Sequence, residues 1–303
     1  MDWDDLRIFL AVVRGRTLIA AGRQLSLDAT TVARRLARFE ERIGRSLFEV
    51  TPNGHILTSR GNELLGHAQA MESAALAALE GSASAEQPTG TIRVSVSEGF
   101  GTWVIAPNLK SFSAKHPDIA VELVASTGFL NPSRREADLA IMLARPKRGP
   151  LIASKLTDYR LGLYVATEPD DPAPIVELNS APLVGYVPDL IYAPELDYLN
   201  ELAPGLRPTL TSTSVNAQAA LIASGAGVGV LPCFIGDADP RLTRIRRKHF
   251  SLQRSFYLVV HRDLRRIRRV SLFVEWLQNM VTGLKPLLQG ERSDKHVLPP
   301  STL

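Results

Sequence analysis

The chain has 303 residues, a formal net charge of +4 and a single cysteine, Cys233. This length is enough for two domains. A single cysteine excludes a disulfide framework, and proteins without disulfides are typical of the reducing cytoplasm. The acidic start, Met1–Asp5, lacks the basic region of a secretory signal. The longest uncharged stretch, residues 210–235, is interrupted by polar residues. We therefore expect a cytoplasmic protein with no membrane span.

The charges are unevenly distributed along the chain. Residues 1–60 contain ten arginines and seven acids, whereas residues 61–240 contain eleven basic and twenty acidic residues. Residues 241–269 contain eleven basic residues and one acid. Such segregation indicates an anionic partner at particular places, and a solvated face is the alternative for any one basic cluster. The 241–269 cluster balances the acidic middle segment or contacts another subunit, and we do not assign it to DNA.

Residues 1–43 show the pattern of three short helices. Candidate N-caps at Asp2, Thr17 and Asp28 begin helices that end near Gly15, Leu25 and Ile43. The apolar faces at helical spacing are Leu6, Phe9, Leu10 and Val13, then Leu18, Ala21 and Leu25, then Val32, Leu36, Phe39 and Ile43. The second and third helices are separated only by the turn at residues 26–28, which is typical of a helix-turn-helix.

Residues 47–57 predict a β-hairpin with its turn at Asn53-Gly54, and residues 58–80 predict a longer helix. The apolar seam of that helix consists of Leu64, Ala68, Met71, Ala75 and Leu79. We favour a dimerisation helix, because an alanine-rich stripe permits close approach of a second helix and little other core is nearby. Packing on the chain's own domain is the alternative.

The small and polar residues 81–90 predict a hinge, after which strands and helices alternate. Strands are expected at 92–97, 119–124, 138–143, 161–166, 183–186, 228–231 and 256–260, and helices at 102–115, 215–224 and 268–283. This order predicts an α/β domain with a parallel or mixed sheet and helices on both faces. The polar tail, residues 286–303, is expected to be disordered.

The third helix carries arginines on the face opposite its apolar stripe. Arg34, Arg38 and Arg42 lie one turn apart, Arg35 lies beside them, and threonines begin the helix. Short polar side chains at a helix start can reach base edges, and long cations can neutralise phosphates or fork onto guanine. The alternative is a solvated face with ion pairs to Glu40 and Glu41. The residues expected to contact DNA are Thr17, Thr30, Thr31, Arg34, Arg35, Arg38, Asn53 and His55.

These motifs resemble those of the LysR-type transcriptional regulators over residues 3–280. The matching segments are LRIFLAVV, Ala21–Leu25, TTVARRLARFEERIGRSLF and LTSRG, then GTIRVSVSEGF, APNLKSFSAKHP, READLAI, GVGVLP and VVHRDLRR. The resemblance implies a winged helix-turn-helix (residues 1–60) whose recognition helix, residues 28–43, enters the major groove of double-stranded DNA. It also implies a linker helix (58–80) and a two-lobed, type 2 periplasmic-binding-protein-like domain (91–285) that binds a small-molecule effector. Homodimers or homotetramers are expected.

The chain departs from the family pattern at several recognition positions. Asp28-Ala29 stands where Ser-Gln is frequent, Ala33 replaces a common serine, and Val50 replaces a common arginine of the wing. Ala29 cannot hydrogen-bond a base, so readout is expected to shift to Thr30, Thr31 and Arg34. These changes prevent transfer of an operator sequence from a relative.

The resemblance places lobe I at residues 91–160 and 261–285 and lobe II at 161–260, with the effector between them. Thr102, expected in the first helical turn, and Arg145, a candidate carboxylate clamp, predict an anionic effector. Simple turn residues and surface charges are the alternatives for these positions. The residues expected to contact effector are Ser97, Thr102, Ser126, Thr127, Arg145, Tyr186, Asn216 and Gly227.

Catalytic and metal-binding patterns are missing from the sequence. The six histidines have no metal-ligand spacing, and Gly225–Gly229 precedes a strand, whereas a dinucleotide loop follows one. Cys233 lies in an apolar stretch and is expected to be an inert core residue. We therefore expect no metal, no cofactor and no enzyme activity. The competing hypothesis is a small-molecule-binding protein or enzyme built on the two-lobed half, without DNA binding.

Overall fold

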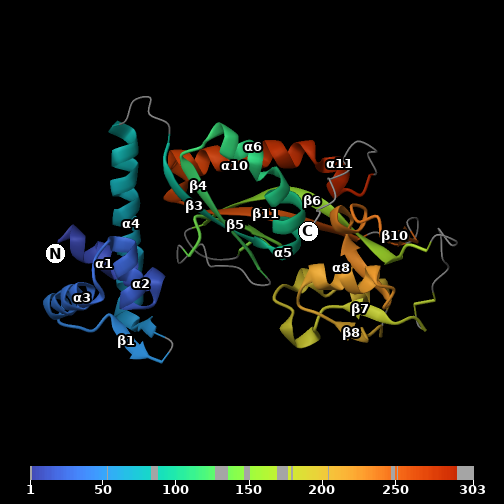
Figure 1. Cartoon of the computed structure of the whole chain (residues 1–303), viewed down its shortest axis with the longest axis horizontal. Coiled ribbons are helices and arrows are strands. Elements are labelled where there is room, and N and C mark those ends of the chain that lie inside the picture. Colours follow the sequence, from blue (N-terminus) through green and yellow to red (C-terminus); the bar gives the residue numbers. More distant parts are fainter. Residues whose placement is uncertain are drawn as a thin grey trace. The chain divides into compact units, whose positions relative to one another are not determined.

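The structure, a computed structural model, describes residues 2–52, 54–82, 88–126, 136–146, 151–168, 177–178, 180–203, 205–246, 250 and 252–291. The chain forms two compact units, the first containing α1 to α4 and the second most of the later elements (Figure 1). The first unit contains α1 (Trp3–Gly15), α2 (Leu18–Leu25), α3 (Ala29–Ile43), β1 (Phe48–Thr51), β2 (Gly54–Leu57) and α4 (Ser59–Ser82).

The first three helices begin at the predicted caps. Asp2 and Asp5 form a capping box on α1, the Thr17 hydroxyl accepts a hydrogen bond from the Ala20 amide of α2, and the Asp28 carboxylate accepts one from the Thr31 amide of α3. Each cap satisfies a backbone N–H that the helix itself leaves unpaired. The prediction of three helices is confirmed.

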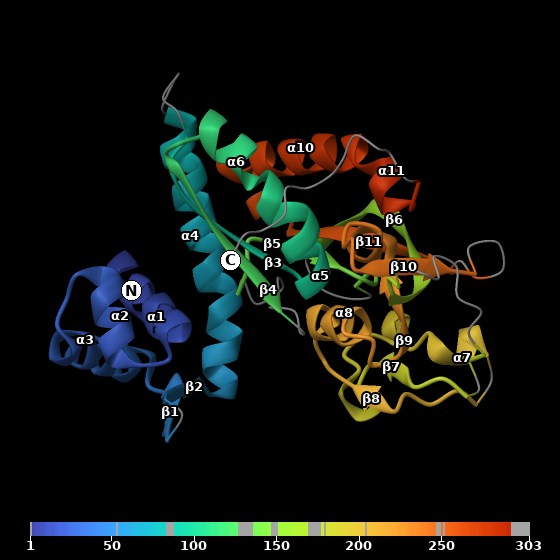
Figure 2. The ribbon, with the colours of Figure 1, turned by 45° about the vertical axis from the view of Figure 1, so that its right-hand side comes forward.

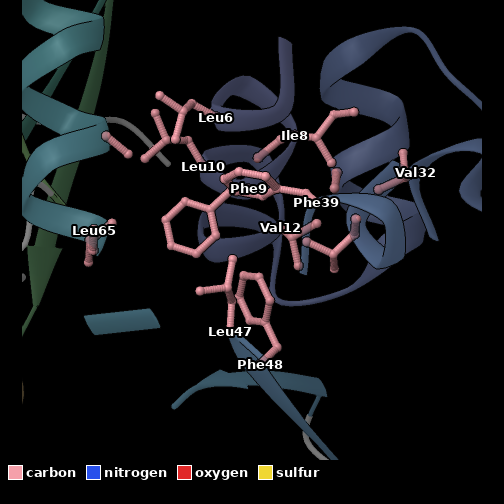
Figure 3. Packing of buried hydrophobic residues seen from close by; sticks show 14 residues of the cluster. Leu6, Ile8, Phe9, Leu10, Val12, Val32, Phe39, Leu47, Phe48 and Leu65 are labelled. Atoms are coloured by element: carbon pink, nitrogen blue, oxygen red, sulfur yellow. The ribbon is translucent and has the colours of Figure 1, made fainter. Parts of the chain in front are cut away.

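The core of the first unit surrounds Phe9 of α1 (Figure 3). The Phe9 ring centroid lies 6.5 Å from that of Phe39 on α3 and 5.4 Å from that of Phe48 on β1. Leu65 of α4 is also buried in this cluster. One side chain therefore connects the helix-turn-helix, the hairpin and the start of α4, and its burial stabilises their arrangement.

The start of α4 packs on its own unit. Leu65 and Ala68 are buried there, whereas Met71, one turn further along, is 49% exposed. The packing alternative therefore holds for the first part of this helix, where the predicted Leu64 is partly buried against the core beside the buried Leu65. The Leu79 side chain lies outside the described part of α4.

The second unit contains β3 (Gly90–Ser97), α5 (Glu98–Phe100), η1 (Gly101–Ile105), α6 (Ala106–Lys115), β4 (Ile119–Ser126), β5 (Leu139–Met142), β6 (Leu151–Ala166), β7 (Leu183–Gly185), η3 (Pro188–Leu190), η4 (Pro194–Leu196), α7 (Leu199–Leu202), β8 (Leu210–Thr211), α8 (Val215–Ala223), β9 (Val228–Pro232), α9 (Cys233–Gly236), β10 (Leu242–Ile245), β11 (Leu252–His261), α10 (Arg268–Gly283) and α11 (Lys285–Leu288). The turn η5 (Leu264–Arg266) connects β11 to α10.

These strands form one mixed sheet with the order β4-β3-β5-β11-β6-β9-β7-β8, and β10 pairs with β6. The β3 strand is parallel to β4 and β5, and β7 is parallel to β8 and β9. The long strands β6 and β11 pair antiparallel between these two groups, and their register shifts between Phe256 and Tyr257. The two halves of the domain are therefore joined through a central pair of strands.

Helices cover both halves of this sheet. In both views α6 and α10 lie side by side over the β3–β5 half, and α8 lies beside β7 and β9 (Figure 1 and Figure 2). Phe112 of α6 and Phe273 of α10 are fully buried, with ring centroids 5.1 Å apart. The predicted α/β class with a mixed sheet is confirmed.

Three expectations need correction or lie partly outside the described residues. The helix expected at 102–115 begins at Glu98, and its residues 101–105 are π-helical, so Thr102 does not lie in the first turn. Residues 286–291 of the expected tail are ordered, because α11 buries Leu288 and the Gln289 side-chain amide donates a hydrogen bond to the Asp158 carbonyl. The predicted hinge includes residues 83–87, which lie outside the described residues, as does the tail from residue 292.

Candidate DNA-binding surface and effector cavity

The first turn of α3 is organised by Asp28. Its carboxylate accepts hydrogen bonds from the Thr31 amide at 2.7 Å, the Thr31 hydroxyl at 2.7 Å and the Thr30 hydroxyl at 2.5 Å. These bonds hold the pKa of Asp28 well below its usual value. Both hydroxyl protons are therefore used inside the protein, and the two threonines present oxygen acceptors and methyl groups to a ligand.

The arginines of α3 divide into two groups. Arg35 forms an ion pair with Asp4, and Arg42 forms one with Asp5 at 2.5 Å, so both connect α3 to α1. Arg34 and Arg38 are exposed, and within the described part of the chain neither side chain forms a hydrogen bond or ion pair. Among the four arginines of α3, Arg34 and Arg38 are therefore the two whose guanidinium groups are free to bind an external anion.

Glu40 and Glu41, the alternative partners for the arginines of α3, form no ion pair with them in the described residues. One Glu40 carboxylate oxygen accepts hydrogen bonds from the amides of Leu47 at 2.6 Å and Phe48 at 3.2 Å. Glu41 is exposed at the end of α3. Glu40 therefore fixes the start of the hairpin against the recognition helix, a role that its position in the sequence did not reveal.

The hairpin is attached to the turn between α1 and α2. The His55 amide donates to the Arg16 carbonyl at 2.7 Å, and Gly54 has a φ of +106°. A Cβ at Gly54 would overlap that Arg16 carbonyl oxygen. The His55 ring is half-buried against Phe48, with ring centroids 6.0 Å apart, and its Nδ1 has no hydrogen-bond partner. The wing is therefore held at its base, while Asn53 at its tip lies outside the described residues.

Some apolar side chains of the hairpin point into solvent. Val50 is 79% exposed and Ile56 is 52% exposed on the β1–β2 pair.

Thr17 is also exposed, and its hydroxyl oxygen already accepts a hydrogen bond from the Ala20 amide. The structure thus places Thr17, Thr30, Arg34 and Arg38 on the surface, and leaves Thr31, Arg35 and His55 half-buried.

A small cavity of about 30 Å³ lies between the two halves of the second unit. Ser97 and Glu98 approach it from the end of β3, Tyr159 and Phe256 from the central strands, and Tyr186 follows β7. The other lining residues are Gly99, Phe100, Leu143, Tyr192, Leu196, Thr213, Val215, Pro232 and Phe234. The wall is thus mostly aromatic and apolar, with one carboxylate, as in many small-molecule sites.

Hydrogen bonds cross between the two halves beside this cavity. The Glu98 carboxylate accepts from the Ser214 hydroxyl at 2.8 Å and from the Val215 amide at 3.1 Å, at the start of α8. The Trp103 indole donates to the Asn216 side-chain oxygen at 2.8 Å, and the Asn216 amide lies 3.5 Å from the Thr102 hydroxyl. The roles of Glu98 and Trp103 could not be predicted from sequence, because their hydrogen-bond partners lie more than 100 residues away.

The cavity raises the pKa of its tyrosines. Burial raises the pKa of Tyr159 and Tyr186 above the ordinary value, and the Glu98 carboxylate adds to the effect on Tyr186. Burial, and after it Glu98, raise the pKa of Tyr192 to about 12. These phenols therefore stay protonated at neutral pH and can donate a hydrogen bond or present a ring face.

The structure brings together only some of the predicted effector residues. Ser97 and Tyr186 line the cavity, and Thr102 and Asn216 contact each other beside it. Arg145 is exposed and donates to the Ala153 carbonyl at 3.3 Å, so it does not line the cavity. Ser126 is half-buried at the end of β4, and Thr127 lies outside the described residues.

Gly227 belongs to the opposite end of its strand. It precedes β9, whereas Pro232 at the end of β9 lines the cavity. A Cβ at Gly227 would overlap the Pro182 carbonyl oxygen. Close backbone packing explains this glycine, and no lining position is found for it.

A larger groove, of about 540 Å³, lies between α6 and α10 and is lined by Phe112, His116, Glu275 and Trp276 among others. It is more open than the inter-half cavity, and its lining residues come from α6, α10 and the residues directly after these helices. Its size alone does not make it the effector site, because ligands of open α/β sheets bind at the carboxyl ends of the strands. We therefore consider the smaller, enclosed cavity the better candidate.

Other kinds of site find no support in the described residues. They contain no group of three or more histidine, cysteine or acidic side chains placed to hold a metal ion. Cys233 is buried, and burial raises the pKa of its thiol. Among the described helices, none combines the length and apolar character needed to cross a bilayer.

Comparison with known proteins agrees with both units. Residues 3–62 match the bacterial regulatory helix-turn-helix protein, lysR family, and residues 85–282 match the LysR substrate binding domain. The Mau operon transcriptional activator of Paracoccus denitrificans is 30% identical over 235 residues, covering 78% of this chain and 81% of that protein. The regulator CrgA of Neisseria meningitidis serogroup C is 27% identical over 249 residues, covering 78% and 81%.

Solved structures show the same fold. Full-length OxyR of Pseudomonas aeruginosa, 17% identical, covers 96% of this chain and 100% of that chain with a TM-score of 0.75. The structure of CrgA of Neisseria meningitidis, 24% identical, covers 92% and 98% with a TM-score of 0.53. On the family matches and the 30% identical relative, the chain belongs to the LysR-type transcriptional regulators, which bind DNA through the helix-turn-helix and a small-molecule effector through the second domain, and are not enzymes.

Proposed function

We propose that this regulator reads its operator mainly with Thr30, Arg34 and Arg38 of α3. The observation that carries the proposal is the division of the arginines: Arg35 and Arg42 are paired with acids of α1, whereas Arg34 and Arg38 are exposed without an internal partner. Thr30, Arg34 and Arg38 follow one another at steps of one helical turn and share one face. Arg34, nearer the helix start, is placed to read a base, and Arg38 to bind phosphate.

The wing and the cap of α2 complete the proposed surface. Asn53 and His55 of the hairpin and Thr17 at the start of α2 are proposed to contact the flanking backbone. The Arg16 carbonyl accepts a hydrogen bond from the His55 amide. The base of the wing is therefore fixed beside the turn that directly precedes Thr17. Arg35 and Thr31 are proposed to act less directly, because their polar groups are already engaged within the unit.

The effector is proposed to bind in the cavity that Ser97 and Tyr186 line, beside Thr102 and Asn216. The expectation of an anionic effector rested on Arg145 and on an early helical turn at Thr102, and neither position supports it. Ser126 lies at the end of β4, Gly227 packs against the Pro182 carbonyl, and Thr127 lies outside the described residues, so the proposed site does not depend on these three. Binding at this position would act on the bonds that Glu98 and Asn216 form across the cavity.

The chain is further proposed to act in the cytoplasm as a homodimer or homotetramer assembled through α4. The exposed Met71, on the helix that otherwise packs Leu65 and Ala68 inward, supports a second helix at that position. Two recognition helices in one assembly would bind two half-sites of an operator.

The operator proposal is tested by comparing Arg34→Ala with Arg35→Ala in duplex binding. Sites selected from a random duplex pool with the full chain serve as ligands. Arg34→Ala should weaken binding to the selected site by about 10- to 100-fold and relax preference at one base pair. Arg35→Ala should weaken binding by less than about fivefold, because the pair that it loses is internal.

Salt dependence separates phosphate contacts from base contacts. Arg38→Ala should weaken binding to every duplex alike and reduce the slope of log affinity against log salt by about 1. Equal effects of the Arg34 and Arg35 substitutions on specificity would contradict the proposed division of α3.

A further inference from the structure

We infer that the effector of this regulator is a small amine that binds as its ammonium ion, with the Glu98 carboxylate as its counterion. The inference rests on the proposed effector cavity and adds the chemical class of the ligand. It depends on the charge of the cavity wall, the tyrosine rings around it and the way in which Glu98 is already bonded.

The charge of the wall favours a cation. Among the described residues that line the cavity, Glu98 is the one acidic side chain, and none is lysine, arginine or histidine. Arg254 acts electrostatically on Tyr159, but its guanidinium forms an ion pair with Glu201 and donates to the Glu195 carbonyl. A buried carboxylate on the ligand would meet Glu98 with no cation to balance it, which is costly in an apolar cavity.

The tyrosines supply the second part of an ammonium site. Tyr159, Tyr186 and Tyr192 all line the cavity, and the Tyr159 ring stacks on Phe256 with centroids 4.3 Å apart. Aromatic faces attract cations through their quadrupole, and the attraction increases when the cation is desolvated. Glu195 also acts electrostatically on Tyr159, more weakly than Arg254, and one of its carboxylate oxygens is buried without a hydrogen-bond partner in the described residues.

The hydrogen-bond partners of Glu98 in the described part of the chain are neutral. Its two oxygens accept from the Ser214 hydroxyl and the Val215 amide, so it is bound to the start of α8. A helix N-terminus is equivalent to only about half an elementary charge. An ammonium group supplies a full charge and strong donors, so it can compete with the helix start for the carboxylate.

The size of the cavity couples binding to movement. A volume of about 30 Å³ is small, so the cavity as it stands admits a ligand of very few atoms. A larger amine requires the two halves to separate and the Ser214 and Val215 bonds to Glu98 to lengthen. The ligand then replaces the donors that Glu98 loses, so amine binding and opening are linked.

The test uses the purified full-length chain and pairs of probes that differ in charge. Benzylammonium is compared with benzoate and benzyl alcohol, and ethylammonium with propionate, by calorimetry and thermal shift. We expect an amine to bind at millimolar concentration or tighter and both carboxylates to bind at least about tenfold more weakly. Glu98→Gln should weaken amine binding by at least about tenfold and leave the weak binding of benzyl alcohol unchanged.

Two further variants keep the test decisive if Glu98→Gln is poorly folded. Tyr192→Phe keeps the ring face and should retain amine binding, whereas Tyr192→Leu should weaken it. Glu275→Gln removes an exposed carboxylate of α10 outside the cavity and should have no effect. Preferred binding of carboxylates, equal loss in the Glu98 and Glu275 variants, or no binding of any amine would overturn the inference.

Duplex binding by the wild-type chain separates this inference from the proposed function. Selected-duplex binding together with carboxylate preference would reject the amine and leave the regulator proposal standing. Amine binding in the cavity without any effect of the amine on duplex binding would support the ligand class and reject its regulatory role.

Discussion

The outer face of α3 and the tyrosine-lined cavity differ in how their charged groups are used. On α3, Arg34 and Arg38 are exposed without internal partners. In the cavity, the Glu98 carboxylate is already bonded to the start of α8. A surface of free groups can bind DNA without rearrangement, whereas a site of bonded groups must exchange partners when it binds a ligand. On the two proposals made above, DNA readout therefore needs no exchange of internal partners, whereas effector binding does.

The largest expected effects test whether the two units are stable independently. Phe9→Ala removes the ring at the centre of the first core and should destabilise that unit by about 3–5 kcal/mol. Phe273→Ala is its counterpart in the second unit, where the ring is fully buried beside Phe112. Peptide-resolved hydrogen exchange should show faster exchange confined to the altered unit. Faster exchange in both units of either variant would contradict independent stability.

The next effects concern two glycines that face carbonyl oxygens. Gly54→Ala places a Cβ against Arg16 at a positive φ, and Gly227→Ala places one against Pro182. Each should cost about 1–3 kcal/mol, the first lowering duplex affinity and the second leaving the charge preference of the cavity unchanged. Gly66→Ala, with open space around it in α4, is the matched control and should be neutral or stabilising by up to about 1 kcal/mol. If Gly227→Ala changed which charged ligands the protein binds, Gly227 would have to be counted as part of the effector site.

A smaller effect is expected from the ion pairs between α3 and α1. Arg35 and Asp4 are both about two-fifths exposed, at 41% and 42%, so solvent screens their attraction. Arg35→Ala should therefore lower the stability of the first unit by less than about 1 kcal/mol. The double variant with Asp4→Ala gives the coupling energy between the two side chains. A coupling well above 1 kcal/mol would show a stronger connection of α3 to α1 than the exposure allows.

The smallest effect is a pH dependence at the start of α3. The pKa of Asp28 is lowered from 3.8 by the Thr30 and Thr31 hydrogen bonds. A lowered pKa in the folded state stabilises the protein above pH 3.8, and this contribution is lost as the pH falls through the lowered value. Asp28→Asn keeps the cap without the charge, so its melting temperature should fall less than that of the wild type between about pH 5 and about pH 2. Identical acid profiles would argue against this role of Asp28.

The helices of the first unit could be predicted from sequence because their signals are local. The caps at Asp2, Thr17 and Asp28 and the apolar spacing on α3 lie within a few residues of the structure that they determine. The pairing of Arg35 with Asp4 is different, because it depends on how α3 crosses α1. Sequence therefore revealed the cationic helix but not which arginines are free.

The cavity could be predicted only in part. Ser97 and Tyr186 follow recognisable strands, and strand ends are where ligands bind in such sheets. Glu98 pairs with Ser214, more than 100 residues away, and Tyr159 and Tyr192 are placed by strand pairing and by a loop without regular spacing. Arg145 lies outside the cavity lining, and its guanidinium donates to the Ala153 carbonyl, a contact that residue type alone does not predict.

The register shift between Phe256 and Tyr257 has a consequence for how the cavity opens. The β6–β11 ladder is continuous on both sides of this bulge, and these paired stretches resist bending. The strand pair is most easily deformed at the bulge itself, where the pairing is interrupted. Phe256 is also part of the cavity wall. We therefore expect that a ligand which displaces this ring would deform the β6–β11 pair where its pairing is interrupted.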